Sequence, residues 1–290
     1  MSARFPVAAI TDEFSPDLAV AVDSMAALGM TGAELRMIFG KNVVDLTDEE
    51  LDRALAIVRG RGLEIVSIAS PLLKCALPGG LTVDARFQQD SFASRHTFED
   101  QARIAAHAFE IARRAGARLI RVFSYWRTVK PRECFDRIVE ALGNLANQAS
   151  RHGLTIGIEN EYACNISTGA ETARLLAALD HPHLKVVWDP ANALLSGEDP
   201  FPEGYGRLPP GRIAHVHAKD CWIENHKIAW APLGEGIIDW KGQVAALARD
   251  GYTGWISLET HWPGPGGDKL QASMICGRTL MKMAGKNGPG

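Results

Sequence analysis

Short apolar runs alternate with longer amphipathic stretches along the chain, a pattern typical of βαβ units and a parallel sheet. Most of the runs are rich in Val, Ile and Leu, as expected for strands that are buried on both faces. Eight strands are predicted: Val7–Ile10, Gly32–Leu35, Glu64–Ala69, Arg118–Phe123, Thr155–Glu159, Lys185–Trp188, Ile213–His217 and Trp255–Leu258.

The stretches between these runs carry apolar residues at three- and four-residue spacing, and several follow an Asp, Ser or Thr that can cap a helix. A glycine then precedes the next strand in LGMTGAEL, RGLEIVSI, AGARLIRVF, HGLTIGIE and DGYTGWISLE, where it reverses the chain after the helix. The predicted helices are Asp17–Leu28, Asp48–Arg61, Thr97–Ala115, Pro131–His152, Thr168–Leu179 and Trp240–Asp250.

This rhythm of eight strands within about 260 residues predicts a (β/α)₈ TIM barrel, forming a single domain over residues 1–290. A doubly wound dinucleotide-binding sheet would place G-x-G-x-x-G after its first strand, but that strand reads VAAITDEF. The Gly- and Pro-rich segment 197–211 is expected to be an active-site loop.

The net charge of the chain argues against some classes of binding partner. The formal net charge is −3 over 290 residues, and Lys and Arg do not gather in any one segment, so nucleic acid and anionic membranes are poor candidates. A small molecule is the expected partner. Five scattered cysteines without a C-x-x-C pair argue against a disulfide framework or a Cys-rich zinc site. With no apolar stretch long enough for a signal peptide or membrane span, we expect a cytoplasmic protein with reduced thiols.

Four consecutive predicted strands end in residues that can bind a metal. They deliver Glu159 in IGIEN, Asp189 in VVWDP, His217 in HVHAKD and Glu259 in ISLETH. An isolated strand-end carboxylate is most often paired with a nearby cation, but the C-terminal ends of barrel strands meet at one mouth. The coincidence therefore predicts one divalent metal ion. Three carboxylates and one imidazole suit Mn²⁺, Mg²⁺ or Co²⁺, and Zn²⁺ is possible.

Five motifs make the chain resemble the xylose isomerase-like TIM barrels, in particular the sugar phosphate isomerase/epimerase group. They are IEN at Ile158–Asn160, WDP at Trp188–Pro190, HVHAKD at His215–Asp220, PLGEGIIDW at Pro232–Trp240 and GYTGWISLE at Gly251–Glu259. The resemblance implies that the four residues named above bind the metal, that Glu159 and Glu259 also act as catalytic acid and base, and that the protein forms a homodimer or homotetramer.

Many members of that group carry a substrate-holding His three residues after the strand-six Asp, where this chain has Asn192. Asn can hydrogen-bond a substrate hydroxyl but does not titrate near neutral pH. His215, which shares a strand face with His217, is a support for the ligand or a substrate contact. Lys219 and Arg36 are candidates to contact an anionic substrate group.

Other polar and aromatic residues stand near the predicted mouth. Glu34 and Arg121 either contact substrate or form ion pairs inside the barrel. Glu161 lies two residues after Glu159, and His261 lies two residues after Glu259. Each is therefore an alternative to that neighbour as a metal ligand. The aromatic candidates for an apolar wall against a sugar are Trp126, Trp222 and Trp230.

The leading functional prediction is an isomerase or epimerase that acts on a keto-sugar or related polyol through a metal-stabilised enediolate. A lyase is the alternative, either an inosose dehydratase or an enzyme that cleaves a 3-keto-glycoside. It would be favoured by an extra acid for the leaving group, such as Lys219 or His261. An endonuclease IV-type DNA-repair enzyme would need more histidines and a basic surface. A sugar-binding barrel without activity would not need two flanking carboxylates.

Overall fold

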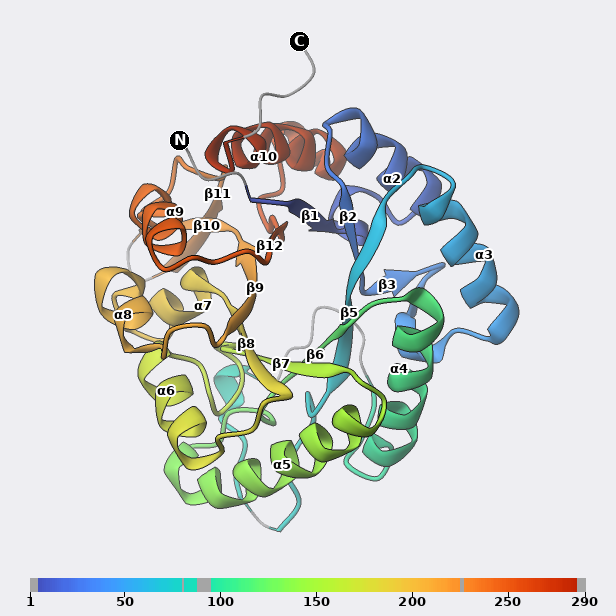
Figure 1. The fold of residues 1–290 in the computed structure, drawn as a ribbon. Helices are drawn as coiled ribbons and strands as arrows, with labels where there is room; N and C mark the ends of the chain where they lie inside the picture. Colours follow the sequence, from blue (N-terminus) through green and yellow to red (C-terminus); the bar gives the residue numbers. More distant parts are fainter. Residues whose placement is uncertain (1–4, 80, 88–94, 225–226, 286–290) are drawn as a thin grey trace.

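Eight parallel strands form a closed barrel in the computed structural model, which describes residues 5–79, 81–87, 95–224 and 227–285 (Figure 1). Strand β1 closes the barrel by pairing with β2 on one side and with β12 on the other, where Val7 lies opposite Ile256. This confirms the predicted (β/α)₈ barrel. The barrel strands are β1 (Val7–Ile10), β2 (Gly32–Leu35), β5 (Glu64–Leu72), β6 (Leu119–Val122), β7 (Thr155–Glu159), β8 (Leu184–Trp188), β9 (Ile213–Ala218) and β12 (Trp255–Leu258).

Helices form a layer around the barrel. The longer ones are α2 (Leu18–Ala27), α3 (Asp48–Arg59), α4 (Gln101–Ala115), α5 (Phe135–Arg151), α6 (Gly169–Ala178), α9 (Trp240–Arg249) and α10 (Lys269–Met283). The shorter helices and helical turns are α1 (Thr11–Phe14), α7 (Pro190–Leu195), α8 (Tyr205–Arg207), η1 (Val43–Asp45), η2 (Ala85–Phe87), η3 (Pro131–Cys134), η4 (Pro200–Gly204) and η5 (Pro265–Gly267).

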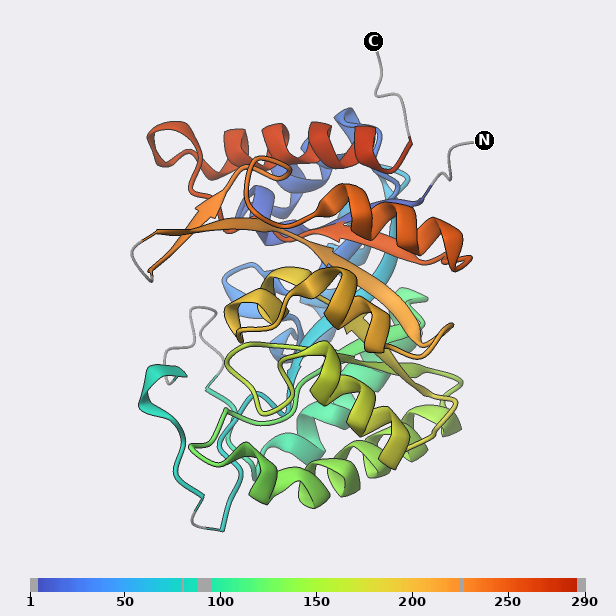
Figure 2. The ribbon, with the colours of Figure 1, turned by 90° about the vertical axis from the view of Figure 1, so that its left-hand side faces the viewer.

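Two small hairpins lie outside the barrel sheet: β3 (Met37–Ile38) with β4 (Lys41–Asn42), and β10 (Asp220–Glu224) with β11 (Lys227–Ala231). The β10–β11 hairpin directly follows β9 and projects at the edge of the molecule (Figure 2). It carries Trp230 toward the site described below.

Local sequence explains where the helices begin and end. Thr47 caps α3 through a reciprocal pair of hydrogen bonds with Glu50, which satisfies backbone N–H groups that a helix start leaves unpaired. Helix α4 ends at Gly116, whose φ of 76° lies in the left-handed region that glycine adopts without steric cost. The amphipathic α5 buries Ile138, Leu142 and other apolar residues, and each such side chain contributes about 1.5–3 kcal/mol when it leaves water.

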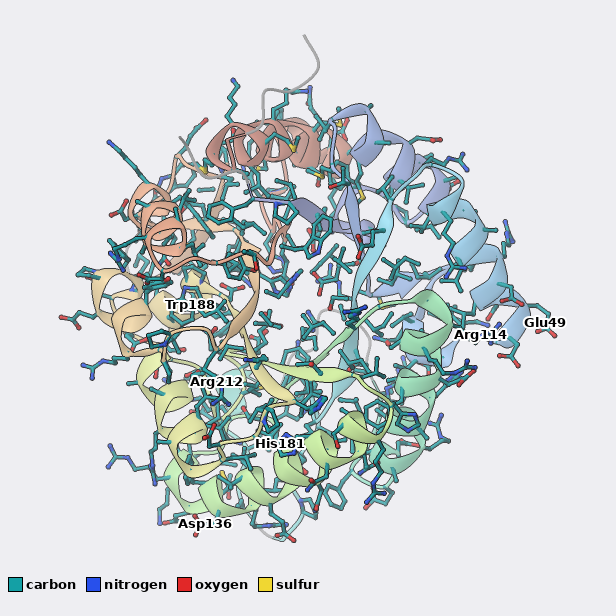
Figure 3. All side chains as sticks on the ribbon, viewed as in Figure 1. Glu49, Arg114, Asp136, His181, Trp188 and Arg212 are labelled. Atoms are coloured by element: carbon teal, nitrogen blue, oxygen red, sulfur yellow. The ribbon has the colours of Figure 1, made fainter. Side chains whose placement is uncertain are left out.

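Charged side chains such as Glu49 and Arg114 lie on the outside, whereas Trp188 is fully buried between β8 and the helical layer (Figure 3). The indole Nε1 of Trp188 donates a hydrogen bond to Oε1 of Gln243 in α9, 3.1 Å away, so its polar edge is satisfied. Among the described residues, every helix is too short or too polar to traverse a lipid bilayer.

Four strands, β1, β2, β7 and β12, have the predicted bounds, while β5 runs three residues further than predicted and ends at Leu72. Helix α10 was not predicted. Small residues such as Ala272, Ser273, Cys276 and Gly277 form much of its buried face, so few large apolar side chains mark the helical period.

The segment 197–211 is not an active-site loop, contrary to the prediction. Within it, η4 packs against α6, α7 and α9, and Gln243 of α9 donates a hydrogen bond to the carbonyl oxygen of Pro200. Glu198 accepts hydrogen bonds from the backbone N–H groups of Gly169 and Ala170 at the start of α6. Pro200 and Gly204 are buried and therefore pack within the helical layer.

Candidate metal centre

Four metal-competent side chains converge at the carboxyl ends of β7, β8, β9 and β12. Glu159 ends β7, Asp189 follows β8, His217 lies near the end of β9, and Glu259 follows β12. Each offers one ligand atom, and these four atoms all lie within 4.8 Å of one another. All four side chains are buried. The structure thus brings together the four residues that the sequence indicates as ligands.

Glu34 orients the imidazole of His217. Oε2 of Glu34 lies 3.1 Å from Nε2 of His217 and 3.0 Å from Nε2 of His215, so one carboxylate oxygen serves both rings. An ionised carboxylate only accepts hydrogen bonds, and both Nε2 atoms therefore carry the proton. This leaves Nδ1 of His217 to face the other carboxylates. Such a carboxylate behind a metal-binding histidine fixes its tautomer.

The donor set requires a positive charge at its centre. Nδ1 of His217 lies 3.2 Å from Oε1 of Glu159 and 3.4 Å from Oε2 of Glu259. Without a proton or a cation between them, three electron-rich atoms would repel one another. Although burial alone would lower the pKa of His217, Glu34, Glu159 and Glu259 raise it well above its usual range. A divalent ion would supply the same charge.

Buried oxygens without hydrogen bonds also fit a cation. Among the described side chains, Oε2 of Glu159 and Oδ2 of Asp189 are enclosed and accept no hydrogen bond. An Arg121 nitrogen lies 3.3 Å from Oε2 of Glu159, and Nζ of Lys219 lies 2.8 Å from Oδ2 of Asp189. Buried carboxylate oxygens in this state are costly unless a cation compensates them. The residues present therefore fit a divalent ion.

Lys219 places an ammonium group inside the centre. Its Nζ lies 2.8 Å from Oδ2 of Asp189 and 3.0 Å from Oε2 of Glu259. Burial would lower the pKa of Lys219, but Asp189 and Glu259 raise it well above the usual range, so the group is charged. Burial raises the pKa of Asp189 to about 7, although Lys219 acts in the opposite direction.

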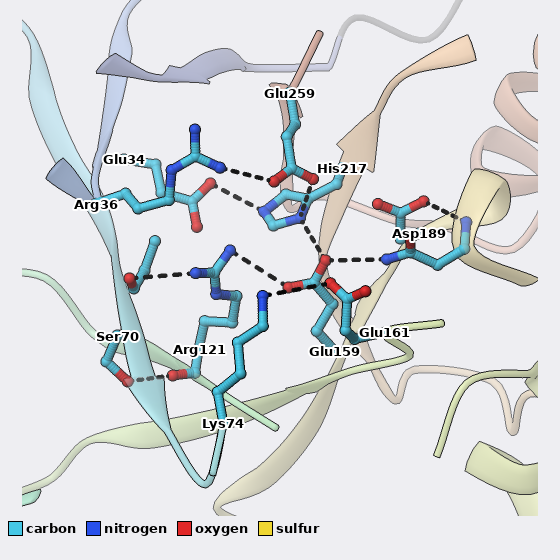
Figure 4. A network of polar contacts seen from close by, with 12 residues as sticks. Glu34, Arg36, Ser70, Lys74, Arg121, Glu159, Glu161, Asp189, His217 and Glu259 are labelled. Carbon is cyan, nitrogen blue, oxygen red and sulfur yellow. Dashed lines mark hydrogen bonds and ion pairs between the residues drawn. The ribbon is translucent and has the colours of Figure 1, made fainter. Parts of the chain in front are cut away.

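Two arginines each contact one of the glutamates (Figure 4). Nη1 of Arg36 lies 3.0 Å from Oε1 of Glu259, while its other nitrogens bind Asp12 and Glu13 of the β1–α2 connection. Nη1 of Arg121 lies 3.3 Å from Oε2 of Glu159. Burial would raise the pKa of Glu259, but Lys219 and His217 bring it well below its usual range.

Asn192 and His215, the other two predicted substrate contacts, lie behind the ligands. Nδ2 of Asn192 donates a hydrogen bond to Oε1 of Glu159, 3.3 Å away, and His215 binds Glu34. Both side chains are buried, and neither lines the cavity beside the centre. This placement favours support of ligands over contact with substrate, and a substrate role for either stays a prediction.

The cavity beside the centre has a volume of about 110 Å³. Arg36, Lys219 and Glu259 line it, together with Trp126 and Trp230, whereas Trp222 does not and instead donates a hydrogen bond to the carbonyl oxygen of Glu235. The remaining lining residues are Lys74, Arg121, Glu161, Tyr162, Ala163 and His261.

Lys74 was missed by sequence reasoning. It follows β5, whose predicted end at Ala69 left Lys74 outside the barrel mouth. Its Nζ lies 3.9 Å from Oε2 of Glu161, which faces the cavity instead of joining the ligands (Figure 4). The rings of His261 and Trp230 are in contact at a tilt of 43°, with centroids 4.7 Å apart, and Nε2 of His261 lies 3.9 Å from Oε1 of Glu259.

A closed (β/α)₈ barrel with three carboxylates and a histidine at its mouth defines a class of TIM barrels with a metal-competent centre. More particularly, the chain belongs to the xylose isomerase-like TIM barrel family, whose model matches residues 22–280. This confirms the family indicated by the sequence motifs.

Known proteins resemble either part of the chain or nearly all of it. An inosose dehydratase from Lacticaseibacillus casei is 30% identical over 140 residues, which cover 43% of this chain and 46% of that enzyme. The chain thus spans about half the length of this relative. The probable 3-DHS dehydratase AsbF from Bacillus anthracis has the same fold, with 22% identity, a TM-score of 0.67, and coverage of 93% of this chain and 97% of that one.

The IOLI protein, whose structure contains a bound zinc atom, also has this fold. It is 15% identical, has a TM-score of 0.71, and is matched over 97% of this chain and 98% of its own.

Proposed function

We propose that the chain is a divalent-metal-dependent lyase that removes water or another β-oxygen substituent from a cyclic hydroxy-ketone of the inosose type. The observation that carries the proposal is Lys219, a proton donor that faces the cavity beside the carboxylate of Glu259. A lyase needs such an acid for its leaving group, whereas a simple epimerase does not. The similarity to inosose dehydratase and to a probable 3-DHS dehydratase supports the same choice over an isomerase.

Glu159, Asp189, His217 and Glu259 would hold the ion. When bound, it would act as a Lewis acid that acidifies the proton next to the substrate carbonyl. The oxygen-rich set formed by these four ligands suits Mn²⁺, Mg²⁺ or Co²⁺. Zn²⁺ is a further choice because the IOLI structure contains zinc.

The protein groups complete the reaction by moving two protons. Glu259, the one ligand that lines the cavity, takes the α-proton onto its carboxylate. The electron pair of that C–H bond forms the new C=C bond as the β-carbon–oxygen bond breaks. Nζ of Lys219 donates a proton to the departing hydroxyl oxygen, which leaves as water. Arg36, at 3.0 Å from Glu259, keeps the base in place.

An isomerase or epimerase is the second candidate, favoured by the position of the two glutamates. Glu159 and Glu259 approach Nδ1 of His217 from different strands, at 3.2 and 3.4 Å. Two such carboxylates can remove a proton on one side of a substrate and return it on the other. This reaction would not require proton donation by Lys219.

Metal analysis of the purified protein, combined with deuterium exchange into inososes and ketoses, tests the proposal. We expect one divalent ion per chain, loss of exchange in Glu259→Gln, and release of water from an inosose. Lys219→Met should retain α-proton exchange while losing water release, whereas the exposed control Lys282→Met should retain both. A metal-free wild-type protein, or exchange into a ketose with a rearranged product and no water loss, would refute the lyase proposal.

A further inference from the structure

A second cavity adjoins the first. It has a volume of about 400 Å³, and Lys74 and Trp126 line both. The first cavity alone, at about 110 Å³, falls below the ~300–1,000 Å³ that enclose most small ligands, while the two together fall within that range. The bound molecule therefore has room for a second part beyond Lys74 and Trp126.

Hydrogen bonds connect the segments that surround this second cavity. The backbone N–H of Trp126 donates to the carbonyl oxygen of Cys75 at 2.9 Å, and that of Tyr125 donates to Leu73 at 2.7 Å. On the far side, His96 binds Asp45 at 2.8 Å. A cavity whose walls are held before binding loses little conformational entropy when a ligand enters.

The walls of the second cavity combine aromatic side chains with hydrogen-bond donors and acceptors. Phe98 is 40% exposed, a large exposure for a phenyl ring, and it borders the cavity with Trp126. Lys74, Arg95 and His96 supply hydrogen-bond donors, and Glu99 supplies an acceptor. Sugar rings present C–H faces to aromatic side chains and hydroxyls to donors and acceptors alike. This chemistry fits a sugar ring better than a purely apolar or purely anionic group.

We infer that the second cavity binds a second sugar ring. The substrate is then a cyclic hydroxy-ketone joined to another sugar through a glycosidic oxygen, with the ketone ring at the metal centre. This inference rests on the proposed function for the reacting ring, and it adds the substrate class and the residues that select it. Phe98 is a specificity residue that touches the distal ring, and Trp126 stands between the rings.

A larger cavity of about 500 Å³ does not serve this purpose. Tyr205, Ile213 and Tyr252 are among the residues that line it, at the amino-terminal ends of the strands. It contains none of the four metal-competent residues, so a ligand there would lie away from the reacting atoms.

The test compares a free inosose with a panel of 3-keto-disaccharides of glucose, in wild type and in three variants. The variants are Phe98→Ala, Trp230→Ala and Val129→Ala. Phe98 lines only the second cavity, Trp230 lines only the first, and Val129 is exposed and lines neither. We expect the wild type to prefer a keto-disaccharide. Phe98→Ala should reduce the ratio of the two kcat/KM values about tenfold, the effect of losing one aromatic contact.

Trp230→Ala should lower kcat/KM for both substrates in parallel, and Val129→Ala should change neither. Equal wild-type preference for the two substrates, or a ratio that Phe98→Ala does not alter, would overturn the inference while leaving the lyase proposal intact.

Calorimetric binding of the unoxidised parent disaccharides separates the two proposals. Because these sugars lack the ketone, their binding does not depend on turnover. If binding occurs and weakens about tenfold in Phe98→Ala, the second cavity is a sugar site even when no substrate reacts. If none binds and no keto-disaccharide is turned over, the second-ring inference fails.

Discussion

Oε2 of Glu34 lies 3.1 Å from Nε2 of His217, on the side of the imidazole that faces away from the other carboxylates. This contact determines which ring nitrogen is available to a metal. Because Glu34 is buried and also accepts a hydrogen bond from His215, contacts with two histidines fix its position.

Glu34→Gln should therefore weaken metal binding about 10- to 100-fold, the usual effect of altering a residue that orients a metal-binding histidine. Competition with a fluorescent chelator measures the affinity. Glu64→Gln, at the exposed start of β5, is the matched control and should bind the metal as the wild type does. Equal affinities in wild type and Glu34→Gln would show that Glu34 does not orient the ligand.

Metal binding should raise the free energy of unfolding. An ion held only by the folded chain, at a free concentration about 100 times its Kd, adds about 2.7 kcal/mol. Thermal denaturation with added metal and with a chelator measures the difference in Tm. Asp189→Asn removes one of the four ligands, so its Tm should respond little. A wild-type Tm that is the same in both conditions would contradict a bound ion.

Asp220 should be important for stability because it organises the connection after β11. Its two carboxylate oxygens accept hydrogen bonds from the backbone N–H groups of Cys221, Gly234, Gly236 and Ile238, at 2.9–3.2 Å. Asp220→Ala leaves these donors without their partner, and because those of Cys221 and Ile238 are buried, the change should cost about 2 kcal/mol or more. Urea denaturation measures the loss, with Glu224→Ala as an exposed control on the same hairpin. A loss no greater than the control's would contradict this role.

The five cysteines should be unreactive in the folded protein. All are buried, and burial raises the pKa of Cys75 to about 12 and that of Cys221 to about 11. Because the thiolate is the reactive form, very little is present at about pH 8. An aromatic disulfide reagent should label almost none of the thiols natively and all five after denaturation. Rapid labelling of the native protein would contradict this prediction.

The sequence predicts the barrel and the four converging residues because both depend on short-range patterns. Buried parallel strands appear as brief apolar runs, and a polar residue at the end of such a run must face the barrel mouth. The position of Glu159 at the end of IGIE and of Glu259 after WISL follows from this rule alone.

Contacts between distant segments are much harder to predict. The link between Arg36 and Asp12, and the place of Lys74 beside the cavity, depend on how connections outside the strands fold. Helix α1, which carries Glu13, has four residues and is too short to show a helical period. Whether Asn192 supports a ligand or contacts the substrate depends on where its side chain points within the barrel. Sequence spacing does not encode that direction.

Strand β12 closes the barrel between β1 and β9, and it leads directly to Glu259. A ribosome finishes β12 after the other seven barrel strands, so the nascent chain holds three of the four ligands while β1 and β9 still have open edges. Those edges can pair with other chains until β12 arrives. The complete metal centre therefore forms when β12 closes the barrel. Tight binding of the metal would show that the newly made chain has closed its sheet.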